Sequence, residues 1–134
     1  MKFLFIFISL FSFLNSYTQT NNLKYKHSDS IALNIQHNKY YYYEETTQEL
    51  TENLKTEEEK CRAIFRWICD NIKYDYKTLN DYKRDRTDPT IVHKTKKAVC
   101  AGYASLFQAM CEEAKINCFY IIGYDTFNHA WNIA

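Results

Sequence analysis

Cys100 and His129 are the two side chains of this sequence whose types and positions could support nucleophilic chemistry. The stretch "AVCAGYASLFQAMC" (98–111) places Cys100 where an apolar helical period begins, directly after Lys96 and Lys97. The start of a helix presents unpaired backbone N–H groups and the positive end of the helix dipole, and neighbouring lysines also favour an anion. Cys100 is therefore a candidate thiolate nucleophile.

His129 begins a predicted strand directly after a predicted turn. From there it could reach the first turn of a helix packed end-on against a sheet, and act as a general base toward the Cys100 thiol. Such a base normally needs a third group to orient it. Spacing alone leaves two interpretations open, because a histidine at a strand end is more often structural and a helix-start cysteine is often buried.

The other cysteines favour neither a disulfide framework nor a metal site. The chain has five, namely Cys61, Cys69, Cys100, Cys111 and Cys118. The first two would lie about 12 Å apart along one helix, and the next two about 16 Å apart along another. Neither pair can bridge, since a disulfide needs Cα atoms within ~7 Å. The odd count leaves at least one free thiol, and we expect Cys111, in the middle of an apolar helix face, to be inert. The cysteines and His129 also lack the short paired spacings of zinc sites, so we expect no metal.

Residues 1–18, "MKFLFIFISLFSFLNSYT", have the pattern of a secretory signal peptide. One lysine precedes an apolar run over 3–14, which is shorter than the ~20 residues that span a bilayer. Ser16 and Thr18 fit the −3 and −1 positions of a cleavage site. We expect a secreted or periplasmic protein with no membrane contact after cleavage; an uncleaved membrane anchor is the alternative.

The composition indicates one globular domain of mixed class. The 134 residues are enough for a single core, and 17% are aromatic, which excludes a disordered chain. A net charge of +1 argues against a nucleic-acid partner. We expect a mobile lead-in or a weak strand over 19–46 and the domain itself over 47–134. The "YYYYEE" run at 40–45 is expected to pack at the rim of the core, with peptide or glycan binding as the alternative.

The apolar patterns predict two helices followed by two strands. The first helix covers "TEEEKCRAIFRWICDNIKYDY" (56–76), with Thr56 as its N-cap, Glu59 completing a capping box and Tyr74 extending the apolar face. A solvated loop is expected over 77–97, broken at Asp88-Pro89, with a short helix near "LNDYK" (79–83). The second helix starts at Cys100 and ends near Lys115. "INCFYIIGY" (116–124) predicts a fully buried strand, and "HAWNIA" (129–134) predicts another. This order predicts an α+β fold with antiparallel strands.

Three segments together resemble the transglutaminase-like superfamily, in the branch of the kyphoscoliosis peptidase and the cytokinesis-associated proteins. They are "AIFRWICDNIKYDY" (63–76), "AVCAGYASLFQAMCEEAKI" (98–116) and "GYDTFNHAWN" (123–132). The resemblance covers about 57–134 and implies a papain-like α+β core, with helices packed on an antiparallel sheet. It makes Cys100 the nucleophile and His129 the general base, and requires no cofactor. The family's aspartate lies on the strand after "HAWN". Since the chain ends at Ala134, we expect the triad and the sheet to be truncated here.

The resemblance implies a secreted cysteine enzyme that acts on protein or peptide amide bonds, by peptide hydrolysis or by acyl transfer. Within the matching motifs, Gly102, Tyr103 and Trp131 are expected to bind the substrate, and Gly102 leaves the backbone open to close approach. Lys115 stands where the family often has glycine, which removes a favourable helix C-cap. A non-catalytic transglutaminase-like module for protein–protein interaction is the alternative.

Overall fold

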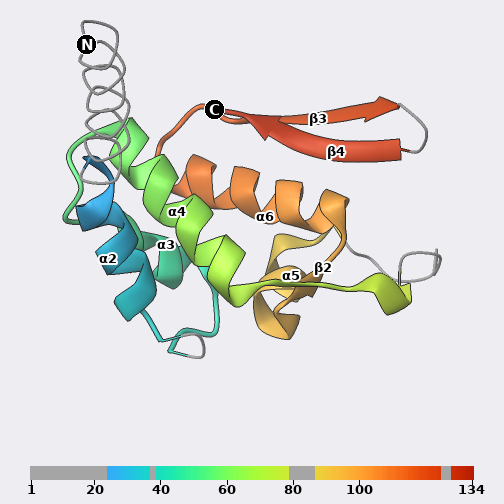
Figure 1. Cartoon of the computed structure of the whole chain (residues 1–134), viewed down its shortest axis with the longest axis horizontal. Coiled ribbons are helices and arrows are strands. Elements are labelled where there is room, and N and C mark those ends of the chain that lie inside the picture. Colours follow the sequence, from blue (N-terminus) through green and yellow to red (C-terminus); the bar gives the residue numbers. More distant parts are fainter. Residues whose placement is uncertain (1–23, 37–38, 79–86, 125–127) are drawn as a thin grey trace, which may run out of the picture.

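The computed structural model describes residues 24–36, 39–78, 87–124 and 128–134. The predicted signal peptide and the short helix predicted over 79–83 lie outside the described residues. The helices are α2 (Lys26–Asn34), α3 (Tyr43–Thr51), α4 (Glu57–Asn71), α5 (Pro89–Thr95) and α6 (Cys100–Glu113), with a 3₁₀ turn η1 (Tyr76–Thr78). The strands are β1 (Lys73–Tyr74), β2 (Lys97–Ala98), β3 (Phe119–Tyr124) and β4 (Asn128–Ile133). Figure 1 shows the β3–β4 hairpin lying along α6, with the remaining helices on the other side of α6. The predicted α+β class is confirmed.

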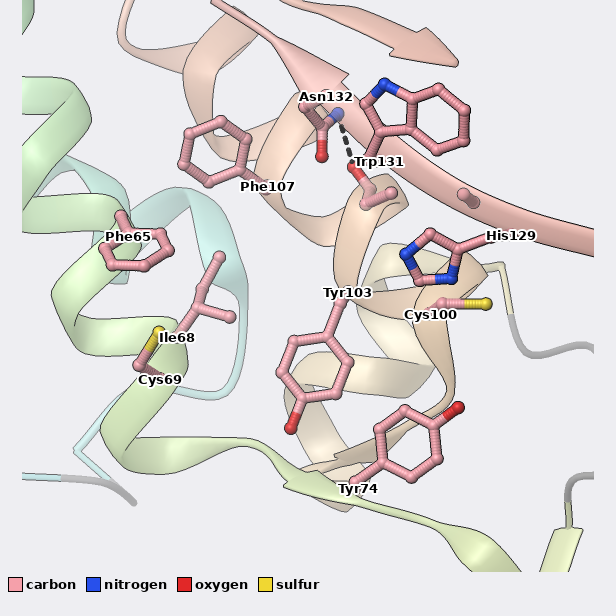
Figure 2. A pocket seen from close by; sticks show the side chains of 12 residues that line it. Phe65, Ile68, Cys69, Tyr74, Cys100, Tyr103, Phe107, His129, Trp131 and Asn132 are labelled. Atoms are coloured by element: carbon pink, nitrogen blue, oxygen red, sulfur yellow. Dashed lines mark hydrogen bonds between the residues drawn. The ribbon is translucent and has the colours of Figure 1, made fainter. Parts of the chain in front are cut away.

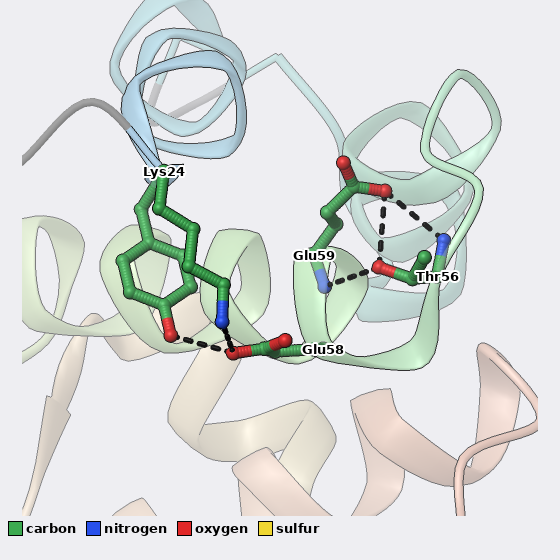
Figure 3. A network of polar contacts seen from close by, with 5 residues as sticks. Lys24, Thr56, Glu58 and Glu59 are labelled. Atoms are coloured by element: carbon green, nitrogen blue, oxygen red, sulfur yellow. Dashed lines mark hydrogen bonds and ion pairs between the residues drawn. The ribbon is translucent and has the colours of Figure 1, made fainter. Parts of the chain in front are cut away.

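Helix α4 begins at the predicted capping box but ends at Asn71, before the predicted end at 76, because the backbone becomes extended at Ile72 and Tyr74 belongs to β1. The backbone N–H of Glu59 donates to the Thr56 hydroxyl at 3.2 Å, and the Glu59 carboxylate accepts from the Thr56 backbone N–H at 3.0 Å (Figure 3). Next to it, the Lys24 ammonium and the Glu58 carboxylate form an exposed ion pair of 2.6 Å. Helices α4 and α6 contact each other in one core, whose largest fully buried apolar side chains are Trp67, Leu50, Ile64, Leu106 and Met110.

The lead-in expected as mobile or as a weak strand instead contains helix α2 and the start of helix α3. Helix α2 packs on α4, and its Ala32 and the following Ile35 are buried in the same core. The Arg62 guanidinium of α4 donates to both carboxylate oxygens of Asp29 on α2, at 2.7 and 2.9 Å. The prediction failed because α2 is polar on average and has only a weak apolar stripe. Of the tyrosine run, Tyr43 packs against the core.

A further helix interrupts the segment expected to be a solvated loop. Asp88 is the N-cap of α5: its carboxylate accepts the backbone N–H groups of Thr90 at 2.7 Å and Ile91 at 3.2 Å. Pro89 occupies the first helical position, where a missing N–H costs nothing. The Asp-Pro pair therefore starts a helix, and His93 is buried within it.

The two strand pairs have different roles. Strands β1 and β2 are parallel, with Lys73 opposite Lys97 and Tyr74 opposite Ala98. Strands β3 and β4 are antiparallel, as predicted. The prediction that β3 is fully buried is wrong. Phe119 and Ile122 are 64% and 70% exposed, since within the described residues the hairpin has two strands and packs only on α6. No described helix is long and apolar enough to cross a membrane.

Candidate functional site

A pocket of about 490 Å³ lies between α4, α6 and β4 (Figure 2). Its lining residues are Phe65, Ile68, Cys69, Tyr74, Cys100, Tyr103, Ala104, Phe107, His129, Ala130, Trp131 and Asn132. Four of the five residues predicted for the site are therefore brought together: Cys100, Tyr103, His129 and Trp131. They come from α6 and β4, which lie side by side in the fold.

Cys100 is the first residue of α6 and is half-buried. The preceding Val99 has extended backbone and offers no side-chain cap, so its side chain does not occupy the backbone N–H groups at the start of the helix. The β1–β2 pair fixes the chain just before it, since the backbone N–H of Asp75 donates to the Ala98 carbonyl at 2.9 Å. The predicted position of Cys100 at a helix start is confirmed.

His129 lies on β4 opposite Gly123 of β3. Its imidazole stacks on the Trp131 indole, with ring centres 5.9 Å apart and planes inclined by 23°. The Trp131 ring lies against Gly123, where a Cβ atom would overlap the indole. The glycine therefore allows the indole to lie flat on the hairpin and to hold the His129 ring at the mouth of the pocket. Figure 2 shows His129 and Cys100 at the same end of the pocket.

Comparison with known proteins gives the same assignment as the predicted motifs. The family model for the transglutaminase-like superfamily matches residues 44–133. The chain belongs to the transglutaminase-like superfamily. It is 34% identical over 102 residues to the kyphoscoliosis peptidase of Homo sapiens and 34% identical over 101 residues to that of Mus musculus. Each match covers 66% of this chain but only 15% of the relative. No solved structure matches at a significant level.

Two tyrosines of the transglutaminase-like core surround the thiol at the base of the pocket. Burial and the neighbouring Cys100 side chain raise the pKa of Tyr74, and an interaction with the Cys100 backbone partly opposes that rise. The Tyr103 hydroxyl donates to the Ile72 carbonyl at 2.5 Å, and its ring stacks on that of Tyr74 at 6.2 Å. Tyr103 thus ties α6 to the end of α4 and supports Tyr74. Tyr74 was not predicted as a site residue, although it lies in the "YD" of the first family motif.

The rest of the pocket was also not predicted. The Asn132 side-chain amide donates to the Ala104 carbonyl at 3.0 Å, which ties β4 to α6 next to His129. The sequence signal for Asn132 is its place as the last residue of the "HAWN" motif. The far end is apolar, formed by Phe65, Ile68 and Phe107. The helical pattern alone assigns Phe65 to the core, although its side chain is half exposed on α4.

Two expectations about the residues around Cys100 are not met. Gly102 is buried within α6 and is not among the residues that line the pocket. Lys96 and Lys97 do not line it either. The Lys96 ammonium lies 4.6 Å from the centre of the Trp67 ring, and burial lowers its pKa to about 8. Charge assistance to the thiol from these lysines is therefore unsupported. Among the described residues, no group of three or more histidine, cysteine or acidic side chains is placed to hold a metal ion.

Proposed function

We propose that this chain is the core of a transglutaminase-like cysteine enzyme that cleaves amide bonds through Cys100 and His129. One observation carries the proposal: a cysteine at a helix start and a histidine on a strand 29 residues later line the same pocket. A thiol and a base that share a pocket are the two parts that covalent acyl transfer requires. Both relatives are named as peptidases, which favours hydrolysis of a peptide bond over transfer to an amine.

The proposed reaction starts with proton transfer from the Cys100 Sγ to the imidazole of His129. The thiolate attacks the carbonyl carbon of the amide, and its oxygen becomes an oxyanion. As the C–N bond breaks, His129 returns the proton to the leaving amine and a thioester remains on Cys100. Water, deprotonated by His129, then releases the acid; a primary amine in its place would give transamidation. The carboxylate that orients His129 would follow on the next strand, beyond Ala134.

The backbone N–H of Cys100 is the first proposed donor to the oxyanion. The Tyr74 side chain lies close to it, since both residues line the pocket and the Cys100 backbone acts on the pKa of Tyr74. A substrate carbonyl oxygen would accept this N–H, and the Tyr74 O–H would be the second donor. Such preorganised donors stabilise the charge that develops in the transition state. A raised pKa suits this role, because a protonated phenol is a donor at neutral pH.

The pocket also limits the substrate. No charged side chain is among the described residues that line it, and its far end is built from Phe65, Ile68 and Phe107. A charged substrate side chain would lose its hydration there without gaining a partner, whereas an aromatic or large aliphatic one would bury apolar area. We therefore propose peptides with a bulky apolar residue next to the amide that is attacked.

Alkylation of the folded protein tests the activated thiol. With iodoacetamide near neutral pH, we expect Cys100 to be labelled at least ~10-fold faster than Cys69, since only the thiolate reacts and His129 assists its formation. Cys69 is a control within the same pocket. The residue as a whole is exposed, but partial burial of its thiol raises its pKa. The His129→Gln variant should slow the labelling of Cys100, and His27→Gln on α2 should not. Equal labelling of Cys69 and Cys100 would contradict the proposal.

Incubation of the protein with apolar peptide amides, followed by acid quenching, tests the reaction itself. We expect a thioester adduct on the peptide that contains Cys100, absent in Cys100→Ala. Adding a fluorescent primary amine separates the two reactions, because hydrolysis leaves the amine free and acyl transfer incorporates it. A protein that binds such peptides equally well as Cys100→Ala, and never forms the adduct, is an interaction module instead.

Export is part of the same proposal. Its support is the apolar segment 1–18, and its test is the N-terminal sequence of the protein recovered outside the cytoplasm. A mature chain that begins after Thr18 is expected, and a chain that retains its first residues would contradict cleavage.

A further inference from the structure

Three thiols lie near one another at the end of α6 opposite to Cys100. Cys61 belongs to α4, Cys111 belongs to α6, and Cys118 lies just before β3. Cys111 is completely buried, Cys118 is 7% exposed, and Cys61 packs against the same core while remaining partly accessible. Cys111 and Cys118 belong to one core cluster against which Cys61 packs, and the Cys111 thiol is near enough to both for their pKa values to depend on it. Cys111 is therefore the middle member of a thiol cluster.

The cluster results from the way in which the two helices pack. Cys61 lies near the start of α4 and Cys111 near the end of α6, and these helices contact each other in the core. The thiols are 50 positions apart in the sequence, so their contact is a property of the fold. Cys69 and Cys100 take no part, since both line the candidate active-site pocket instead.

Cys61 is the member of the cluster that solvent can reach. It lines a second pocket, of about 580 Å³, together with Glu58, Arg62 and Phe107. The interaction with Cys111 lowers the pKa of Cys61, and the interaction with Cys61 and burial raise the pKa of Cys111. A thiol-disulfide exchange needs an accessible thiolate to attack and a second thiol within reach to resolve the mixed disulfide. Cys61 and Cys111 meet these two requirements.

We propose that Cys61 and Cys111 form a site of oxidative modification, at which a small-molecule disulfide links α4 to α6. The Cys61 thiolate attacks one sulfur of the small disulfide, forms a mixed disulfide and releases a thiolate. Cys111 then attacks the Cys61 sulfur, its proton passes to solvent or to the departing group, and the second small thiolate leaves. Two protein thiols are oxidised and one small disulfide is reduced to two thiols. The proposal does not depend on the proposed enzymatic function.

Cys118 is the competing partner for Cys111. Burial raises the pKa of Cys118, and its exposure is too low for attack on a solvent-borne disulfide. A link between Cys111 and Cys118 would also close only a short local loop, whereas the proposed bond closes a loop of about 50 residues and joins two helices. It would thus clamp the end of α6 opposite Cys100.

The test treats the reduced, folded chain with glutathione disulfide and then blocks the remaining thiols with N-ethylmaleimide. The expected product has lost two hydrogen atoms and carries three maleimides. Trypsin should then yield residues 61–62 disulfide-linked to residues 98–115, and fragment ions or the Cys100→Ser variant assign the bond to Cys111. The oxidised chain should melt roughly 5 °C or more above the reduced chain.

Matched variants on α4 complete the test. Cys69→Ser should still form the bond, and Cys61→Ser should lose it. A stable Cys61–glutathione adduct without the internal bond, or a link from Cys111 to Cys118, would overturn the proposal. If Cys61→Ser does not fold, the peptide map of the oxidised chain without substitutions decides, because it identifies the bonded pair directly.

Discussion

Acidification tests the most unusual titratable group in the core, His93. Its side chain is 1% exposed; its Nε2 lies 2.9 Å from the Thr46 hydroxyl, and its ring stacks on Trp67 with centres 5.4 Å apart. Burial, and secondarily the charge of Lys96, lower its pKa from 6.5 to about 4. The folded protein therefore keeps His93 neutral where an unfolded chain would protonate it.

The size and the sign of the effect follow from this difference in pKa. Between pH 6.5 and pH 4 the unfolded chain binds a proton that the folded chain does not, so the free energy of unfolding falls as the pH falls. Above pH 6.5 the contribution is fully present. With about 1.36 kcal/mol per pH unit over a gap of about 2.5 units, roughly 3 kcal/mol is lost by pH 4. Carboxylates held at lowered pKa values, such as Asp29, lose their contribution only at still lower pH.

Urea unfolding followed by tryptophan fluorescence, at several values from pH 7.5 to pH 4.5, measures this slope. The His93→Gln variant should be less stable at pH 7.5 and should lose most of the dependence, whereas His27→Gln, an exposed residue of α2, should retain it. Parallel curves for the parent and His93→Gln would refute the reasoning. If His93→Gln does not fold, an NMR titration of the parent that places the His93 imidazole near pH 6.5 would refute it equally.

Two further predictions concern backbone positions. Lys115 follows α6 with φ of 64°, so Lys115→Gly should raise the free energy of unfolding in urea by about 1 kcal/mol. Lys97→Gly is the control at a lysine without positive φ; a gain of the same size there would contradict the explanation. Gly123→Ala should push the Trp131 indole off the hairpin, displace His129 and slow the alkylation of Cys100 several-fold. Tyr124→Ala, at the neighbouring exposed position, should not, and an unchanged rate in Gly123→Ala would show that the indole does not position His129.

The local features of the fold could be predicted because their causes lie within a few residues. The capping box of α4 joins Thr56 to Glu59, and the start of α6 at Cys100 follows from where an apolar period begins. The same locality explains two failures. Asp88-Pro89 can end one helix or start another, and only the buried partners of His93 favour the second outcome. Helix α2 has too weak an apolar stripe to be recognised without the Arg62–Asp29 contact that holds it on α4.

What the sequence by itself determined was the family, the position of Cys100 at a helix start and the antiparallel order of the last strands. Only the tertiary structure decided that Cys100, His129 and Tyr74 line one pocket, that Trp131 lies on Gly123 and that Cys61 packs against the core that contains Cys111. Each of these contacts depends on how α4, α6 and the hairpin cross, and that geometry is set by the packing of many side chains at once. No local pattern encodes it, because residues distant along the chain approach each other only when the core closes.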